Sequence, residues 1–123
     1  MSANRLRIGR IGEAEAKRRL ELGGYVILAV NWRRRQGELD LVARDGERIV
    51  FVEVRSRSAA SSGRYGTAAE SVDPRKQRQV RMLAQKYMQL TNRHDAAMRF
   101  DVIAVTIGAD DTIAEYRHYE AAF

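Results

Sequence analysis

Four charged residues in two short segments have the types and the spacing of a metal-dependent hydrolytic site. Glu38 and Asp40 lie two positions apart in one segment, and Glu53 and Arg55 lie two positions apart in the next. Side chains two apart on a strand share a face. Carboxylates are ligands for Mg²⁺ or Mn²⁺, and such a cation can activate water for attack on a phosphodiester. Arg55 adds a positive charge that can hold a phosphate.

A predicted hairpin brings the two segments together. Asp45-Gly46 is a pair favoured in two-residue turns, and a turn there places Arg44 opposite Glu47. This register, or one of the same parity, separates an apolar face from a charged face. The predicted pairs are Leu41 with Val50, Leu39 with Val52, and Glu38 with Glu53. The apolar face then carries Leu39, Leu41, Val50, Val52 and Val54, and the charged face carries Glu38, Asp40, Glu53 and Arg55.

The like charges on this face need compensation, because carboxylates that face each other across strands destabilise a sheet by up to about 1 kcal/mol per pair. A divalent cation would supply that compensation. The alternative is that the acids face solvent and pair with the abundant arginines. The spacing by itself leaves both interpretations open.

Two predicted helices add charged groups near these strands. Residues 4–22 carry small and apolar residues at helical spacing and end at Gly23-Gly24. Glu13 lies in that stripe, where an unpaired carboxylate would be costly to bury, so we expect it to join the metal-binding acids. Asp73-Pro74 predicts the start of a second helix that runs to about residue 90. Lys76 is expected to reach inward near the helix N-terminus, with a solvated lysine as the alternative.

The remaining elements follow from alternation and turn residues. Strands are predicted at residues 25–32, 38–44, 48–55, 99–107 and 112–119. Residues 56–71 are rich in Ser, Gly, Ala and Arg without a period, and we expect a basic surface loop there. The predicted order is αβββαββ, an α/β class with the first three strands as a meander.

Composition favours one domain, over residues 1–123, that binds a polyanion. The 22 Lys and Arg exceed the 16 Asp and Glu, which gives a formal net charge of +6 and favours DNA, RNA or an acidic surface as the partner. The absence of cysteine excludes disulfides and thiolate metal sites. No apolar run approaches the roughly 18 to 20 residues of a membrane helix, and no signal-peptide core is present. We therefore expect a cytoplasmic protein without a membrane partner.

Basic residues near the predicted site are expected to contact phosphates. The nucleic-acid-binding residues predicted are Arg33, Arg34, Arg35, Arg57, Arg64 and Lys76. Trp32 and Tyr87 are interpreted as packing residues, His94 and His118 as surface residues, and Asp101 as structural.

Taken together, the motifs resemble the YraN-like family of uncharacterised proteins. The resemblance extends from about Gly12 to Val105. It is carried by Gly12-Glu13, Gly37-Glu38-Leu39-Asp40, Phe51-Val52-Glu53-Val54-Arg55, Lys76 and Arg99-Phe100-Asp101. It implies a three-layer restriction-endonuclease-like core, with helices packed on a central mixed sheet, similar to archaeal Holliday-junction resolvases.

The resemblance also implies roles for individual residues. Glu13, Asp40 and Glu53 match the metal-binding acids. Asp40, Glu53 and Arg55 match the catalytic positions, with Arg55 where a lysine is expected. Glu38 and Gln77 are expected to support the site from beside it. Arginine keeps its charge and can clamp a phosphate, but it does not readily release a proton.

Three functions are consistent with these features. One is Mg- or Mn-dependent endonucleolytic hydrolysis of structured DNA, for which DNA is favoured over RNA and a homodimer is an option. Another is a non-catalytic nucleic-acid-binding module that keeps the nuclease fold, motivated by Arg55. A third possibility is that the basic charge binds an acidic protein and the carboxylates are structural.

Overall fold

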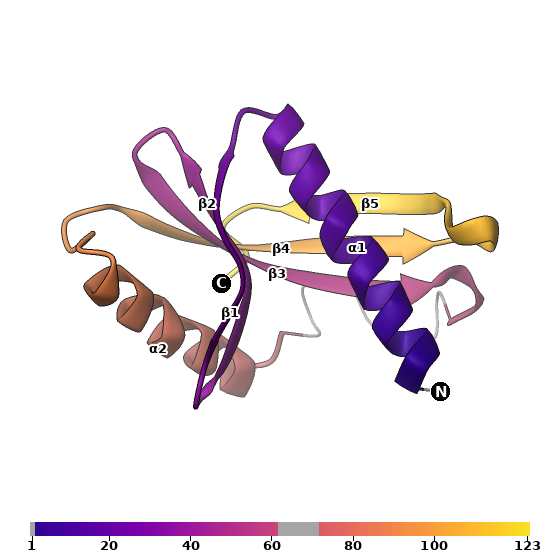
Figure 1. Cartoon of the computed structure of the whole chain (residues 1–123), viewed down its shortest axis with the longest axis horizontal. Helices are drawn as coiled ribbons and strands as arrows, with labels where there is room; N and C mark the ends of the chain where they lie inside the picture. The colour runs from indigo at the N-terminus through magenta and orange to yellow at the C-terminus, as the bar shows by residue number, and fades with distance from the viewer. Residues whose placement is uncertain (1, 62–71) are drawn as a thin grey trace.

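The computed structural model describes residues 2–61 and 72–123 (Figure 1). Its elements in chain order are α1 (Ser2–Leu22), β1 (Val26–Arg34), β2 (Gly37–Asp45), β3 (Arg48–Ser58), η1 (Ala59–Ser61), α2 (Pro74–Leu90), β4 (Met98–Ile107), η2 (Ala109–Asp111) and β5 (Ile113–Tyr119). The predicted order of helices and strands, αβββαββ, is confirmed. Within the described residues, neither α1 nor α2 combines the length and the apolar composition needed to cross a bilayer.

The strands form one five-stranded mixed sheet in the order β1-β2-β3-β4-β5. β1, β2 and β3 form the predicted antiparallel meander. β3 and β4 pair in parallel and are connected along the chain through α2, whereas β4 and β5 are antiparallel. The mixed sheet is therefore as predicted.

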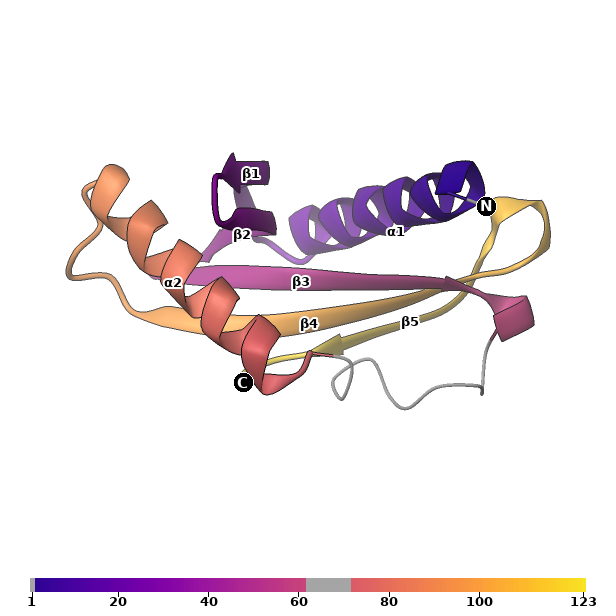
Figure 2. The same cartoon turned by 90° about the horizontal axis from the view of Figure 1, so that it is seen from below.

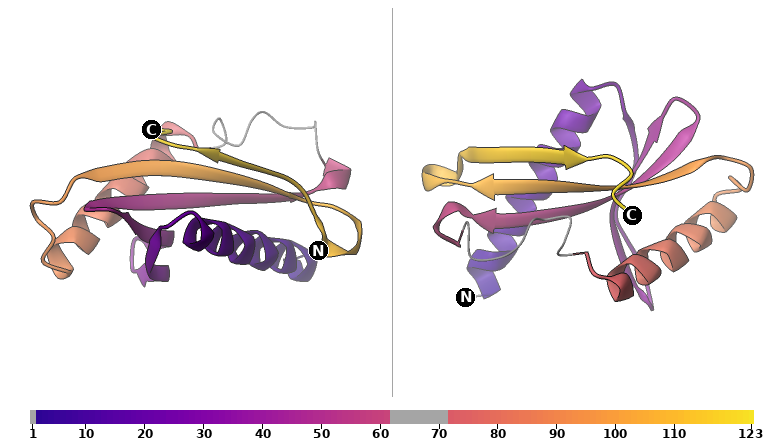
Figure 3. Two further views of the ribbon diagram at one scale, coloured as in Figure 1. Left: turned by 90° about the horizontal axis from the view of Figure 1, so that it is seen from above. Right: turned by 180° about the vertical axis from the view of Figure 1, so that it is seen from behind.

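The two helices cover opposite faces of the sheet (Figures 2 and 3). Ile49 and Phe51 of β3 pack in the apolar cluster that contains the buried stripe of α2. Val50 and Val52, which alternate with them, pack in the cluster that contains Ala16 and Leu20 of α1. β3 is thus buried on both faces, as in the central layer of a three-layer α/β core. This architecture is consistent with the restriction-endonuclease-like core that the resemblance implied.

The hairpin between β2 and β3 has a different register from the one predicted. Asp45 pairs with Arg48 and Leu41 pairs with Val52, which is a shift of two residues. The turn is formed by Gly46-Glu47, and Gly46 adopts a positive φ of 62°. Because the shift is even, the parity of the predicted register is kept.

The apolar face predicted for the hairpin is only partly correct. Leu41, Val50 and Val52 do pack together against α1, but Leu39 packs in the α2 cluster. The reason is that β2 pairs with β3 only from Leu41 onward, and the part of β2 that precedes Leu41 turns away from β3. The β1–β2 hairpin crosses β3 steeply as a result (Figures 1 and 2).

Some element boundaries also differ from the prediction. β1 continues to Arg34, and β3 continues to Ser58, so the first residues of the predicted loop are strand. Residues 62–71 of that loop lie outside the described residues. The second helix agrees closely: Asp73 is its N-cap and accepts a hydrogen bond from the Lys76 amide at 2.9 Å. Its buried residues are the predicted Val80, Leu83, Ala84, Tyr87 and Met88.

The contact between α1 and β3 depends on Gly12. A Cβ atom at this position would lie 1.8 Å from Oγ and 2.9 Å from Cβ of Ser56. Rotation of the Ser56 side chain moves only its Oγ, so the conflict with Cβ would persist. A side chain at position 12 would therefore push α1 away from the sheet.

Gly12→Ala is expected to lower the free energy of unfolding by about 1 to 3 kcal/mol, because overpacking outweighs the gain in helix propensity. Gly9→Ala is the matched control in the same helix, since a Cβ there would meet nothing within 4 Å. It is expected to raise stability by about 0.5 to 1 kcal/mol. Urea unfolding of both variants measures the difference, and equal effects would contradict the proposed close approach.

Candidate active site

Asp40 lies at the point where β2 separates from β3. The last ladder pair before the separation is Leu41 with Val52. The Oδ2 atom of Asp40 then accepts a hydrogen bond of 2.9 Å from the amide of Val54. The pKa of Asp40 is raised by burial, while the Val54 hydrogen bond and the charge of Lys76 oppose the rise. The Asp40 carboxylate thus replaces the backbone carbonyl that would otherwise pair with the Val54 amide. It lies half-buried in the gap between the two strands.

Glu53 lies on β3 and is buried, with 3% of its surface exposed. It has the same strand parity as Phe51 and therefore points to the α2 side of the sheet. Burial is the main cause that raises the pKa of Glu53 to about 7, and the nearby charge of Asp40 raises it further. Lys76 and Arg55 act in the opposite direction. Asp40 and Glu53 are therefore an interacting pair of acids in a poorly hydrated place.

Two cations face the Glu53 carboxylate. Nζ of Lys76 lies 3.6 Å from Oε1 of Glu53, and Nη2 of Arg55 lies 3.9 Å from the same atom. The Lys76 and Arg55 side chains are 31% and 35% exposed, so both also reach solvent. Nε of Arg55 is buried and has no hydrogen-bond partner in the described part of the chain. The position of Arg55 beside Glu53 was predicted from the sequence, whereas the pairing of Lys76 with Glu53 is seen only in the folded structure.

Glu13 approaches Asp40 from α1. Burial raises the pKa of Glu13, and the charge of Asp40 adds to the rise, while a hydrogen bond with the Asn31 side chain lowers it. β1 pairs Val30 with Leu41 and Trp32 with Leu39, which places Asn31 opposite Asp40. Asn31 was missed by the sequence analysis. In the structure Asn31 has a positive φ of 51°, which asparagine tolerates better than most residues. The spacing of residues in the sequence does not reveal this conformation.

The two predicted supporting residues are engaged elsewhere. Glu38 pairs with Arg33 at 2.6 Å, although its charge still raises the pKa values of Glu13 and Asp40. Nε2 of Gln77 donates to the carbonyl of Val72 at 2.9 Å, so Gln77 ties the start of α2 to the preceding segment.

The carboxylates fit a divalent cation as a pair. Among the residues that the structure describes, no group of three or more His, Cys, Asp or Glu side chains is arranged to hold a metal ion. Mg²⁺ commonly takes one or two protein carboxylates and completes its shell with water and substrate phosphates. Asp40, which is half-buried, and Glu53, which is buried, both have a raised pKa and suit that donor set because a bound cation would relieve their repulsion. The predicted third ligand, Glu13, lies on the α1 side of Asp40.

The predicted phosphate-contacting arginines lie around the turn that joins β1 to β2. Arg33 and Arg34 end β1, and Arg35 is in the turn. The guanidinium of Arg34 lies 4.2 Å from the ring centre of Trp32, and the Trp32 ring packs edge-to-face on Tyr87 and against the apolar cluster on the α2 side of the sheet. The predicted packing roles of Trp32 and Tyr87 are thus confirmed.

The same turn is tied to α2, because Nε2 of Gln79 donates to the carbonyl of Gln36 at 2.7 Å. Gly37, the next residue, also lies against Gln79 and Leu83 of α2. Of the two other arginines predicted to contact phosphates, Arg57 lies on β3 and shares a face with Glu53 and Arg55. Arg64 lies outside the described residues.

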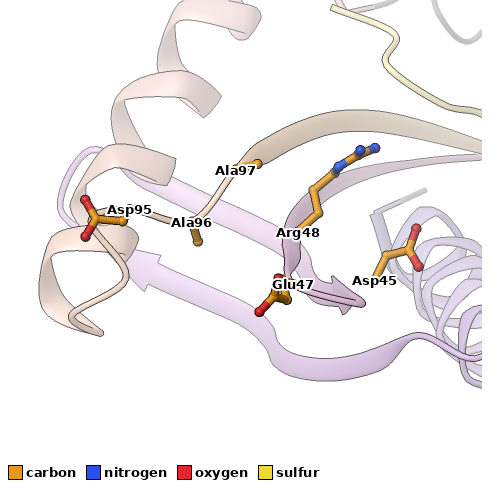
Figure 4. A pocket seen from close by; sticks show the side chains of 6 residues that line it. All are labelled: Asp45, Glu47, Arg48, Asp95, Ala96 and Ala97. Atoms are coloured by element: carbon orange, nitrogen blue, oxygen red, sulfur yellow. The ribbon is translucent and has the colours of Figure 1, made fainter.

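Two cavities lie at different ends of the hairpin. A cavity of about 340 Å³ adjoins the acid pair and is lined by Arg55, Asp73, Arg75, Lys76 and Gln79. A larger cavity of about 660 Å³ lies between the β2–β3 turn and the segment that leads into β4 (Figure 4). It is lined by Asp45, Glu47, Arg48, Asp95, Ala96 and Ala97. None of the predicted site residues lines the larger cavity, whereas Arg55 and Lys76 line the smaller one.

A second buried carboxylate belongs to a separate network. Asp101 is fully buried and accepts from Arg99 at 2.7 Å and from the amide of Ala121 at 3.0 Å. His118 lies 2.7 Å from the same carboxylate, so the prediction of an ordinary surface histidine was wrong. The two residues are 17 positions apart, and the pairing of β4 with β5 brings them together. This network links the C-terminal residues to β4, which agrees with the structural role expected for Asp101.

The chain is similar to proteins of one family over most of its length. The model of the family described as "Uncharacterised protein family UPF0102" matches residues 12–105. A "UPF0102 protein" of Pelotomaculum thermopropionicum is 42% identical over 123 residues, which is 100% of both chains. One of Moorella thermoacetica has the same identity and coverage, and one of Rhodococcus opacus is 44% identical over 106 residues, or 86% of this chain and 87% of the relative.

Glu53→Gln is expected to stabilise the metal-free protein above neutral pH. The pKa of Glu53 is about 7 in the folded state against 4.5 ordinarily, so the folded protein binds more protons between these values and loses stability as the pH rises through them. The variant lacks this loss. In chelator, its free energy of unfolding should exceed that of the wild type by about 3 kcal/mol at alkaline pH, and the difference should vanish near the ordinary glutamate pKa.

Glu15→Gln is the control with the opposite sign. Hydrogen bonds from Arg18 and Arg19 lower the pKa of Glu15 to about 2, so this variant should be less stable than the wild type at neutral pH and equal to it in strong acid. Urea unfolding across pH measures both variants. A Glu53→Gln effect that does not change with pH would show that the Glu53 carboxyl is not perturbed in the folded protein.

Proposed function

The chain belongs to the uncharacterised protein family UPF0102, and from its acid pair we propose that it is a divalent-metal-dependent nuclease that hydrolyses phosphodiester bonds in structured DNA. The observation that carries this proposal is the position of a half-buried Asp40 beside the buried Glu53 at the separation of β2 from β3, with the pKa of both raised. Perturbed acids that interact in a cleft are characteristic of functional sites rather than of solvent-facing ion pairs. Burial thus disfavours the interpretation of these acids as solvated surface charges.

Each residue of the site has a role in this proposal. Asp40 and Glu53 would hold Mg²⁺ or Mn²⁺, with Glu13 as a further acid on the α1 side. The bound cation would supply Lewis acidity toward the phosphate and a lowered pKa for water. Arg55 would hold the scissile phosphate and stabilise its developing negative charge, as its partly exposed side chain beside Glu53 allows. The hydrogen bond from Val54 would keep the Asp40 carboxylate oriented.

DNA is the polyanion that we favour as substrate, because the motif resemblance is to DNA resolvases and the net charge is +6. Arg33, Arg34 and Arg35 would bind the backbone beside the site, as their place on a turn tied to α2 suggests. A junction presents two symmetric cleavage points, so a homodimer is the assembly that this function favours. Sedimentation of the purified protein measures it.

The second candidate is a nucleic-acid-binding module without turnover. The observation that favours it is Arg55, because a guanidinium does not release a proton at physiological pH. This function predicts DNA binding that falls steeply with salt, needs no metal and persists in Asp40→Asn.

Mg²⁺ or Mn²⁺ is expected to bind the wild type saturably in calorimetric titrations, and Asp40→Asn and Glu53→Gln are expected to abolish binding. Asparagine keeps an acceptor for the Val54 amide, so Asp40→Asn tests the charge rather than the fold. Glu38→Gln is the matched control, since Glu38 already pairs with Arg33 and should be dispensable for the metal.

With the metal present, we expect cleavage of fluorescently labelled linear, flapped or four-way DNA by the wild type. The rate should fall by about a hundredfold or more in Asp40→Asn, because the metal contributes several kcal/mol to transition-state stabilisation. Intact substrates with the wild type and either metal would rule out the nuclease. Salt-sensitive binding without cleavage would favour the second candidate.

A further inference from the structure

Lys76 occupies a position between the buried acid pair and the adjoining cavity. Its backbone is held in the first turn of α2, where its amide donates to the cap residue Asp73. Its side chain reaches back to Glu53 at 3.6 Å, and the same side chain lines the cavity of about 340 Å³ together with Arg55, Arg75 and Gln79. Its ammonium group therefore lies within reach both of the Glu53 carboxylate and of the cavity.

We propose that Lys76 is an exchangeable counter-ion, which neutralises Glu53 in the metal-free protein and binds a phosphate of DNA in the adjoining cavity when a divalent cation occupies the carboxylates. This inference rests on the proposed function and assigns Lys76 a role in substrate positioning.

The charges of the site support this exchange. The two carboxylates of Asp40 and Glu53 are balanced by two cations, Lys76 and Arg55, while no metal is present. Addition of a divalent cation leaves an excess of two positive charges at the cavity, which favours the entry of a phosphate. In the same state the attraction between Lys76 and Glu53 is weakened, because the new cation neutralises the carboxylate.

The geometry identifies Lys76 as the group that exchanges. Its 3.6 Å contact with Glu53 is longer than a direct hydrogen bond of about 2.7 to 3.2 Å, so the ammonium is not locked in place. The lysine side chain is a flexible four-carbon chain that ends in a compact ammonium group. The ammonium can therefore change position without displacing the neighbouring side chains. Arg55 is less free, since its Nε is buried against the site.

The consequence is a coupling between metal and DNA through one side chain. If binding of the cation frees Lys76 for phosphate, the cation increases the affinity for DNA, and DNA increases the affinity for the cation by the same factor. A lysine that only covers apolar surface would produce no such coupling.

The coupling is tested with Ca²⁺, an oxygen-liganded divalent cation, and with a short fluorescent DNA duplex. Calorimetry measures Ca²⁺ affinity without DNA, and anisotropy measures DNA affinity with Ca²⁺ and with chelator. For Lys76→Gln we expect Ca²⁺ to bind about fivefold more tightly, because a repelling charge is removed, and the gain in DNA affinity on adding Ca²⁺ to disappear. Lys76→Arg should keep both properties near those of the wild type.

Arg75→Gln is the matched control, because Arg75 lines the same cavity in the same helical turn and has no ion pair with Glu53 among the described residues. It should leave Ca²⁺ affinity unchanged and weaken DNA binding equally with and without the cation. Thermal unfolding confirms that each variant is folded.

Wild-type Ca²⁺ affinity in Lys76→Gln, or weaker affinity, would overturn the exchange while leaving the proposed metal site intact. Absence of Ca²⁺ binding by the wild type would instead remove the metal site and the exchange with it.

Discussion

The hydrogen bond from the Val54 amide to Asp40 is made where β2 turns away from β3, and the candidate site depends on it. An unpaired amide in a central strand would be costly to bury, so the separation of the two strands requires a replacement acceptor. The Asp40 carboxylate is that acceptor. The separation places the half-buried Asp40 beside the buried Glu53 of β3, and it directs the β1–β2 hairpin toward α2, where Gln79 holds the turn.

The site is assembled from elements on both sides of the sheet. α1 contributes Glu13 from one face and α2 contributes Lys76 from the other, while Asp40 lies between them at the separation of the strands. Burial of two interacting carboxylates opposes folding, and the positive charges of Lys76 and Arg55 reduce that cost without removing it. The protein thus retains an electrostatic strain that a divalent cation would relieve, which is the physical link between the stability of the fold and its proposed activity.

The predicted elements were largely correct because they rest on local signals. The Asp73-Pro74 cap and the apolar stripe placed α2, and alternation placed the strands and the parity of the β2–β3 hairpin. The register differs by two residues from the one that an Asp45-Gly46 turn gives, but it keeps the predicted parity. The choice of turn, Gly46-Glu47 rather than Asp45-Gly46, changes no face and so leaves no mark on the hydrophobic pattern. Leu39 was assigned to the wrong cluster because strand alternation assumes a flat sheet, whereas β2 twists away from β3.

The sequence by itself determined the α/β class, the order of the elements, and the acids and cations that form the candidate site, because each depends on residue type and on spacing within one element. The tertiary structure decided which of these groups meet: Lys76 with Glu53, Asn31 with Glu13, and His118 with Asp101. These partners come from different elements. Their contacts are set by the twist of the sheet and by how closely Gly12 lets α1 approach it, and no periodicity in a single segment records either quantity.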